Sequence, residues 1–313
     1  MTAGAAASFA MGDKSDVEAS GGRDAHGAGA RRRSIVAGLI GRGIQLSRTP
    51  AMQESAGASR GLRLVYQLLD ADMMGEPAPD LPTILHAAEL CGFAGVNVTY
   101  PYKREIVPLL DGLSDAASRV GAVNTVVFRD GKRFGHNTDC WGFAESFRQG
   151  MGGVKSGTVL LVGAGGAGGA VAHALLDCGV ERILVRDIDG QAADILIASL
   201  EARPDGAGRA ERADDLSAAA KQADGIVNAS PVGMAKLPGL PVPAEMIEPR
   251  HWAADVVYFP LETEFLATAR KRGCRVLAGS GMALFQAVRA FELFTGETPD
   301  VAAMKETFDS FAS

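Results

Sequence analysis

Several features that mark common protein classes are missing from this chain of 313 residues. Its four cysteines form no CxxC pair and no histidines are paired at metal spacing, which argues against structural zinc and fits a reducing cytoplasm. No apolar run approaches the roughly 18 residues of a membrane helix. The formal net charge of −6, without a basic stripe, argues against a nucleic-acid partner. We therefore expect a cytoplasmic protein that holds no metal and binds neither nucleic acid nor a membrane.

The first 30 residues are rich in Ala, Gly, Ser and Asp and lack the positive start and apolar block of a signal peptide. We interpret 1–30 as a disordered N-terminal extension. The whole chain is 47% hydrophobic and 22% charged, values typical of a globular protein that is long enough to form two domains.

Strands and helices alternate after this extension, which predicts an α/β fold. Thr49 is expected to cap the first helix, and Asp130-Gly131 predicts the turn of a hairpin. In the first half we expect strands at 34–40, 62–68, 95–99, 123–128 and 133–136, and helices at 50–58, 81–91, 103–110 and 115–120.

The most informative stretch is 158–187, TVLLVGAGGAGGAVAHALLDCGVERILVRD. An apolar strand at 159–162 breaks at the glycine-rich turn GAGGAG, a helix with apolar periodicity follows, and a second strand ends on Asp187. Glycines are needed in such a turn because the pyrophosphate of a dinucleotide must approach the backbone at a helix N-terminus. A flexible glycine linker would not be flanked by apolar strands, so the pattern predicts a Rossmann-type dinucleotide-binding domain.

Asp187 also indicates which dinucleotide binds. It lies 24 residues after Gly163 (187 − 163), where an acid pairs with the ribose hydroxyls and repels a 2′-phosphate, which favours NAD over NADP. Arg186 could accommodate that phosphate, but the alternation of side chains along a strand should turn it to the opposite side. The expected cofactor is NAD, with NADP as the alternative.

The rest of the chain is expected to complete this domain and then return to the first one. A helix at 140–149 would lead into the dinucleotide-binding domain, 203–212 would form a loop, and an apolar helix at 282–293 would pack back on the first domain, leaving a cleft between the two. Further strands are expected at 225–228, 254–258 and 275–277, and helices at 191–200 and 261–271.

Two polar residues outside the glycine-rich segment are candidates for proton transfer. Lys103 follows a strand end in NVTYPYK, and Asp139 lies at the expected domain junction in GHNTD. A lysine held by a carboxylate in a partly dry cleft can exchange a proton with a secondary alcohol while a nicotinamide takes the hydride. The local sequence is equally consistent with a solvated lysine and an aspartate that caps the next helix. We interpret His136 as a half-exposed structural histidine.

From about Val36 to Phe308 the chain resembles the shikimate/quinate dehydrogenase family, and within it the NAD-preferring quinate/shikimate branch. Eight motifs in one order carry the resemblance: GLIGRGIQLSRTPAM (38–52), GVNVTYPYK (95–103), GAVNTVV (121–127), GHNTD (135–139), GAGGAGGA (163–170), NASPVGM (228–234), DVVYFPLETEFL (255–266) and GSGMALFQ (279–286).

The resemblance implies roles for individual residues. Lys103 and Asp139 match the catalytic pair. The substrate positions are matched by Ser47 and Thr49 (carboxylate), Asn97, Thr99, Asn124 and Gln286 (ring hydroxyls) and Tyr258 (pocket lining). The cofactor positions are matched by Gly163, Ala164, Gly165, Gly166, Ala167, Asp187, Ser230, Val232, Val256 and Gly279.

Three departures from the common shikimate pattern favour the NAD branch. Leu46 stands where the family often has histidine, Thr49 replaces a second serine, and Asp187 takes the position of an arginine in NADP-specific members. The implied enzyme oxidises the C3 hydroxyl of quinate, shikimate or both to the 3-dehydro acid, with hydride passing to NAD and the proton to Lys103. The alternatives are an NADP-dependent shikimate dehydrogenase of aromatic amino-acid biosynthesis and a non-catalytic sensor of either acid.

The implied architecture is an N-terminal α/β substrate-binding domain plus a Rossmann-type dinucleotide-binding domain, with the active site in the cleft between them. The expected boundaries are 31–139 with 280–313 for the substrate-binding domain and 140–279 for the NAD-binding domain. The oligomeric state stays open, with a homodimer as one candidate.

Overall fold

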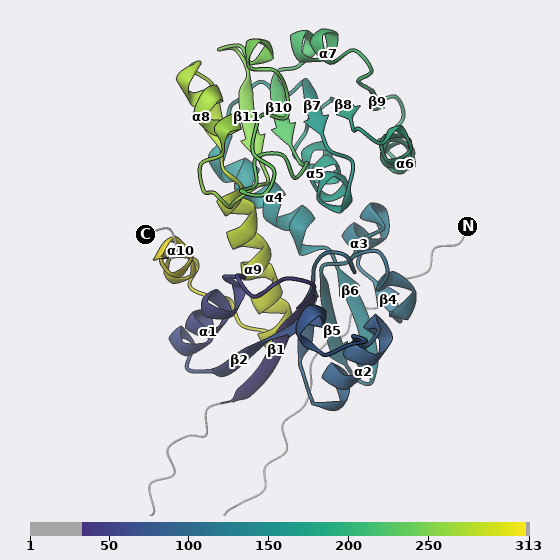
Figure 1. Cartoon of the computed structure of the whole chain (residues 1–313), viewed down its shortest axis with the longest axis vertical. Helices are drawn as coiled ribbons and strands as arrows, with labels where there is room; N and C mark the ends of the chain where they lie inside the picture. Colours follow the sequence, from purple (N-terminus) through teal and green to yellow (C-terminus); the bar gives the residue numbers. More distant parts are fainter. Residues whose placement is uncertain (1–32, 311–313) are drawn as a thin grey trace, which may run out of the picture. The chain divides into compact units, whose positions relative to one another are not determined.

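The computed structural model describes residues 33–310, so the expected extension at 1–30 lies outside the described residues. Within that range the chain forms two six-stranded sheets, each covered by helices on both faces (Figure 1). This arrangement confirms the predicted α/β class.

The first sheet is mixed and contains the N-terminal strands. Strand β1 pairs in parallel with both β2 and β3. Strand β5 pairs antiparallel with both β3 and β6, and β4 pairs in parallel with β6. Its strands, in spatial order, are β2 (Arg63–Asp70), β1 (Ser34–Gly41), β3 (Gly95–Val98), β5 (Thr125–Arg129), β6 (Lys132–His136) and β4 (Gly112–Leu113).

The two faces of this sheet carry separate cores because successive side chains of a strand point to opposite sides. Leu39 of β1 packs with helices α1 (Thr49–Ser59), α9 (Gly279–Thr295) and α10 (Val301–Asp309). Ile40, the next residue, packs with α2 (Leu81–Leu90) and α3 (Asp115–Val120) on the other face. The last long helix therefore packs back on the first sheet, as predicted.

The second sheet is entirely parallel and holds the glycine-rich segment. Its central strands read as apolar runs because both of their faces are covered, which is typical of parallel sheets. In spatial order they are β12 (Arg275–Leu277), β11 (Trp252–Asp255), β10 (Gly225–Asn228), β7 (Thr158–Val162), β8 (Arg182–Arg186) and β9 (Ala210–Arg212).

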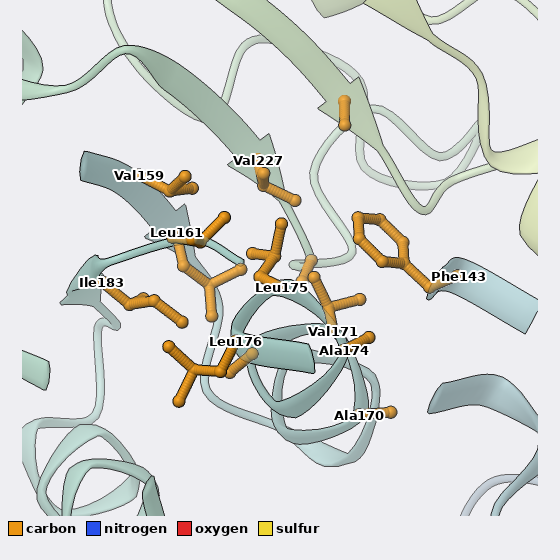
Figure 2. Packing of buried hydrophobic residues seen from close by; sticks show 14 of the residues in the cluster. Phe143, Val159, Leu161, Ala170, Val171, Ala174, Leu175, Leu176, Ile183 and Val227 are labelled. Atoms are coloured by element: carbon orange, nitrogen blue, oxygen red, sulfur yellow. The ribbon is translucent and has the colours of Figure 1, made fainter. Parts of the chain in front are cut away.

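Helices cover both faces of this second sheet. Figure 2 shows one face, where Leu175 and Leu176 of α5 (Gly166–Asp177) meet strands β7 and β8, and Phe143 of α4 (Thr138–Gly150) packs beside them. Helix α6 (Gly190–Glu201) adds to the same core, and α7 (Leu216–Gln222) and α8 (Glu264–Lys271) cover the other face. Three short 3₁₀ turns complete the described chain: η1 (Ala71–Met73), η2 (Val107–Leu109) and η3 (Ala244–Met246).

The strand order reverses at β7, whose two neighbours are β8 and β10. In an open parallel sheet a ligand binds at the carboxyl ends of the strands beside such a reversal. The loops that follow β7 and β10 meet there, because a Cβ atom on Gly163 would lie 2.6 Å from the carbonyl carbon of Ala229. The topology therefore places the glycine-rich turn at the expected ligand position.

Two of the predicted helix features are wrong. Thr49 does not cap α1: it is the first helical residue, and the cap position is Arg48. Residues 103–110 form turns and the short η2 in place of an α-helix. Pro108 has no N–H group to donate to Arg104, and the Arg104 carbonyl instead accepts from Val107 at 3.2 Å.

Three boundaries of the second sheet also differ from the prediction. Residues 210–212 of the expected loop form β9, because they pair with the exposed edge of β8. Strand β11 ends at Asp255 and not at Tyr258, since the Asp255 carboxylate takes the N–H of Val257. Helix α8 begins at Glu264, where the Thr263 hydroxyl caps it.

Candidate active site

A cavity of about 590 Å³, here called the central cavity, is lined by strands of the first sheet, by helices, and by the loops that follow strands β10 and β11 of the second sheet. It brings together all nine residues that the sequence suggested for catalysis and substrate binding: Ser47, Thr49, Asn97, Thr99, Lys103, Asn124, Asp139, Tyr258 and Gln286. These residues are spread over 240 positions of the chain (286 − 47 + 1) and come from eight different elements or loops. Such convergence is what a polyhydroxylated ligand requires.

Lys103 and Asp139 form an ion pair in this cavity, with Lys103 Nζ 2.6 Å from Asp139 Oδ2. Their side chains are 25% and 11% exposed, so both are largely shielded from water. Asp139 lies in the first turn of α4, where the helix dipole favours a carboxylate. The cap of that helix is Asn137, whose Oδ1 accepts from the Cys140 N–H at 3.0 Å. Asp139 is therefore free of the capping role that the alternative interpretation gave it.

The loop that carries Ser47 and Thr49 is fastened by a buried carboxylate that the sequence analysis missed. Asp70, at the end of β2, accepts from the N–H groups of Gly43 and Ile44, both at 3.0 Å, and from Gln45 Nε2 at 2.9 Å. Burial alone would raise the pKa of Asp70, but the hydrogen bonds from Gln45, Asp72 and this loop outweigh it and lower the pKa. An ionised Asp70 thus holds in place the loop segment that leads to the hydroxyls of Ser47 and Thr49.

The glycine-rich turn fits a dinucleotide phosphate by its backbone alone. Gly163 has φ +107°, and a Cβ on Gly168 would lie 2.0 Å from the Gly163 carbonyl oxygen, so both positions exclude larger residues. Gly165 is the N-cap of α5 and offers no side-chain cap, and nothing lies within 4 Å of where its Cβ would be. No side chain caps the first N–H groups of α5, and the space beside Gly165 is open, so the start of this helix suits an anion.

Asp187 lies against this turn. Its Oδ2 accepts from the Ala164 N–H at 2.6 Å, and its Oδ1 accepts from the Asp189 N–H at 2.8 Å. The carboxylate is thus held at the rim of the turn, at the end of β8, where it can reach the hydroxyls of a ribose. The residues present fit an NAD-type dinucleotide.

The remaining cofactor candidates separate into two groups. Ala167, Ser230, Val256 and Gly279 line the central cavity. Gly163, Ala164, Gly165, Gly166, Asp187 and Val232 do not line it. A Cβ on Gly279 would lie 2.6 Å from the Val257 carbonyl oxygen, so this position admits only glycine and lets α9 begin directly beside β11.

A second buried carboxylate, Asp255, shapes the loops after β10 and β11. It accepts from the Val257 N–H at 2.9 Å, from Asn228 Nδ2 at 3.0 Å and from the Thr263 hydroxyl at 2.6 Å. Burial raises the pKa of Asp255 to about 6, and these hydrogen bonds only partly offset that effect. Like Asp70, it positions a loop that lines the cavity.

His136 and the other potential metal ligands of the described residues show no sign of a further site. His136 is half-buried, and burial together with Arg289 and Arg129 lowers its pKa, which fits a neutral structural histidine. Within residues 33–310, no group of three or more His, Cys, Asp or Glu side chains is arranged to hold a metal ion. No helix in the same range is long and apolar enough to cross a membrane.

Comparison with known proteins adds independent findings. The family description "Shikimate dehydrogenase substrate binding domain" matches residues 39–126, and "Shikimate 5'-dehydrogenase C-terminal domain" matches 279–307. A shikimate dehydrogenase (NADP(+)) of Streptomyces avermitilis is 47% identical over 272 residues, which is 87% of this chain and 94% of the relative. The chain belongs to the shikimate dehydrogenase family.

Further relatives lie in the quinate/shikimate branch of the family. A quinate/shikimate dehydrogenase (NAD(+)) of Corynebacterium glutamicum is 46% identical over 283 residues, covering 88% of this chain and 98% of the relative. The solved quinate dehydrogenase of Corynebacterium glutamicum in complex with NAD superposes with a TM-score of 0.83 at 44% identity, over 89% of this chain and all of that one. Relatives named for NADP and relatives named for NAD are thus about equally similar to this chain in sequence.

The two matched segments divide the site in an informative way. Lys103 and Asn124 fall in the first match, and Gln286 falls in the second. Asp139 and the glycine-rich turn lie between the two matches, so their place in the site rests on the geometry described above.

Sequence reasoning missed two residues that this site uses. Asp70 follows an apolar run at a strand end, which is a weak signal for a functional carboxylate. Tyr66, which hydrogen-bonds Asn97 from β2, carries no signal at all because an aromatic residue in a strand is ordinarily part of the core.

Proposed function

We propose that this chain is an NAD-dependent dehydrogenase that oxidises the C3 hydroxyl of quinate, shikimate or both to the 3-dehydro acid. The observation that carries the proposal is the 2.6 Å pair of Lys103 and Asp139 inside a cavity that also presents hydroxyl and amide side chains and borders the glycine-rich turn through Ala167. The printed activities of the Corynebacterium relatives support the same reaction.

The substrate-side residues bind and orient the ring. Ser47 and Thr49 offer hydroxyls to the carboxylate, and the Thr49 N–H donates to Ser47 Oγ at 3.3 Å, which ties the two together. Asn97, Thr99 and Asn124 offer partners to the ring hydroxyls. Several partners are needed because each buried polar group left unpaired costs about 1–3 kcal/mol.

Proton transfer is assigned to Lys103. In its unprotonated form the Lys103 amine takes the proton of the C3 hydroxyl. The resulting ammonium forms the ion pair with Asp139 described above, which stabilises it. In the reverse direction the same ammonium returns the proton to the carbonyl oxygen. NAD, when bound, supplies the hydride acceptor. Because both side chains are largely shielded, their interaction is stronger than it would be in water.

The domain division remains part of the proposal. Residues 31–139 with 280–313 would form the substrate-binding domain, and 140–279 the NAD-binding domain, with α4 and α9 as the two connections. We also propose a cytoplasmic location, supported by four unpaired cysteines, and a homodimer, which size-exclusion chromatography with light scattering would test.

The proposal is tested by a two-by-two kinetic matrix. Quinate and shikimate are each assayed with NAD and with NADP, following reduced dinucleotide over a broad pH range. We expect the highest kcat/KM in the NAD column, because Asp187 disfavours a 2′-phosphate. A higher kcat/KM with NADP and shikimate would support the biosynthetic alternative. Binding of either acid with no turnover under any condition would refute the enzyme and support a sensor.

A further inference from the structure

Behind the substrate-side wall of the central cavity lies a buried chain of hydrogen-bonded side chains, here called the amide network. Its five members are each at most 5% exposed: Tyr66, Asn97, Asn124, Thr125 and Thr138. The network runs from β2 at one edge of the first sheet to the first residue of α4, next to Asp139. Only Asn97 and Asn124 of the five also line the cavity.

The orientation of the Asn97 amide is fixed by a group that can only accept. Its Nδ2 donates to the backbone carbonyl of Asn124 at 3.2 Å and to Thr125 Oγ1 at 2.9 Å, so both N–H bonds are used. Its Oδ1 accepts from the Tyr66 hydroxyl at 2.6 Å. Since a carbonyl oxygen has two lone pairs, one acceptor position of Oδ1 is left for a ligand and no donor is left.

The orientation of the Asn124 amide is fixed by a group that can only donate. The backbone N–H of Thr138 donates to Asn124 Oδ1 at 2.6 Å, and the Thr125 hydroxyl reaches the same oxygen at 3.3 Å. Its Nδ2 donates to Thr138 Oγ1 at 2.9 Å, which uses one of its two N–H bonds. One N–H bond of Asn124 is left for a ligand.

We propose that the two amides present opposite polarity to the substrate, Asn97 as an acceptor and Asn124 as a donor, and that Tyr66 is the positioning residue that holds Asn97 in this state. The inference rests on the proposed function and goes further, because it states which way each hydrogen bond to the ring runs. The hydroxyl that meets Asn97 must donate. A ketone, ether or fluorine at that place would leave two acceptors face to face and be rejected.

Tyr66 is suited to this task because it stays protonated. Burial raises the pKa of Tyr66 well above its ordinary value of 10, so its hydroxyl remains a donor at any working pH. Asn97 Oδ1 is already anchored before a ligand arrives, and the substrate does not have to order it.

The test is a double-mutant cycle of Tyr66→Phe and Asn97→Ala. Tyr66→Phe keeps the packed ring and removes one hydrogen bond, so we expect the substrate KM to rise about fivefold, with kcat and the KM for NAD changed less than about twofold. In the Asn97→Ala background the same substitution should have no further effect, since residues that act through one another are non-additive. Tyr102→Phe is the matched control, because Tyr102 is equally buried but its hydroxyl contacts Arg42 at 3.1 Å, outside the network.

A second arm tests the polarity itself with substrate analogues in which one non-reacting ring hydroxyl is replaced by fluorine. The analogue altered at the hydroxyl that meets Asn97 should have a KM about tenfold above that of the parent acid, and Asn97→Ala should remove most of this difference. If Asn97→Ala does not fold, Thr125→Val takes its place, because it removes a partner of the same amide.

Each outcome bears on a different statement. Equal effects of Tyr66→Phe in both backgrounds, or a loss of thermal stability with an unchanged substrate KM, would overturn the positioning role. Tolerance of fluorine at every non-reacting position would overturn the polarity. Absence of turnover by the wild-type protein would instead refute the proposed function, and the cycle would then be read from the affinity for shikimate or quinate alone.

Discussion

On the substrate side of the central cavity the groups that face a ligand are side chains, held in place by the amide network and by Asp70. On the dinucleotide side they are backbone N–H groups at the start of α5, exposed by glycines that no larger residue could replace at Gly163 and Gly168. The comparison shows that substrate choice can be altered by ordinary substitutions, whereas the dinucleotide side can be altered mainly at its turn and at Asp187.

The largest expected effect is on the substrate side, at the proton-transfer pair. Lys103→Ala should lower kcat by about 10²- to 10⁴-fold with little change in the substrate KM, because a general base acts mainly in the transition state. Steady-state assays with quinate and shikimate measure this. Arg104→Ala, the exposed neighbour in the same turn, is the control and should leave kcat unaltered. An unaltered kcat in Lys103→Ala would remove the residue from its role.

The next effect separates two kinds of glycine on the dinucleotide side. Gly163→Ala places a Cβ 2.6 Å from Ala229 at φ +107° and should destabilise the fold by about 2–4 kcal/mol, visible as a lower Tm. Gly165→Ala meets nothing within 4 Å and should leave Tm close to that of the wild type. It should nevertheless raise the KM for NAD about tenfold or more, because the new methyl group lies where a phosphate approaches the helix. An unaltered KM for NAD would place the phosphate elsewhere.

A smaller change is expected when the acid at the rim of the turn is removed. Asp187→Ala should lower the ratio of kcat/KM for NAD to that for NADP by about tenfold or more, since the repulsion of a 2′-phosphate disappears. Asp189→Asn is the matched control: it removes a charge two residues away but keeps a side chain that can cap α6. Equal ratios in wild type and Asp187→Ala would show that another residue selects the dinucleotide.

A further effect, on stability and not on catalysis, distinguishes the two buried carboxylates, whose pKa values are shifted in opposite directions. The pKa of Asp70 is lowered, so its contribution to stability is present above its unfolded pKa and is lost as the pH falls through the folded value. The pKa of Asp255 is raised to about 6, so its contribution is present at low pH and is lost as the pH rises through about 6.

Urea unfolding between about pH 2 and about pH 8 checks both signs, because the Asp70 contribution is lost only below the ordinary carboxyl pKa of about 4. The free energy of unfolding of Asp255→Asn should increase relative to that of the wild type as the pH rises, by up to about 2–3 kcal/mol. The cost of Asp70→Asn should be greatest near neutral pH and should shrink toward acidic pH. A difference from wild type that does not vary with pH, for either variant, would contradict the assigned shift.

The two sides of the cavity also differ in how far they could be predicted from the sequence. The dinucleotide side is encoded locally, because an apolar strand, a glycine turn, a helix and Asp187 follow one another within 30 residues, and all were predicted. Strand β9 was not predicted, since it is short, has only one apolar residue, Ala210, and forms a strand only by pairing with β8. The expected helix at 103–110 does not form, because Pro108 has no N–H group for an α-helical hydrogen bond.

The substrate side is encoded by contacts between distant residues, and less of it could be foreseen. In the sequence, Lys103 and Asp139 stand out only as polar residues beside predicted elements, and the fold brings them to 2.6 Å. The family resemblance implies the roles of Asn97 and Asn124. The polarity of their amides depends on the Asn124 carbonyl and the Thr138 N–H, with the Tyr66 hydroxyl anchoring Asn97, and no local pattern marks these contacts. A residue that acts by hydrogen-bonding another side chain, as Tyr66 does, can be recognised only once the three-dimensional structure shows its partner.

The proposed reaction requires that the reacting hydroxyl lie beside Lys103 and Asp139 while the rest of the ring contacts Asn97 and Asn124. A crystal structure of Lys103→Ala with NAD and shikimate or quinate bound would measure this directly. We predict the C3 hydroxyl oxygen within about 3.5 Å of Asp139 or of a water replacing the amine, with Asn97 accepting from and Asn124 donating to neighbouring ring hydroxyls. A ring bound with C3 directed away from these two positions, or outside the central cavity, would contradict the account.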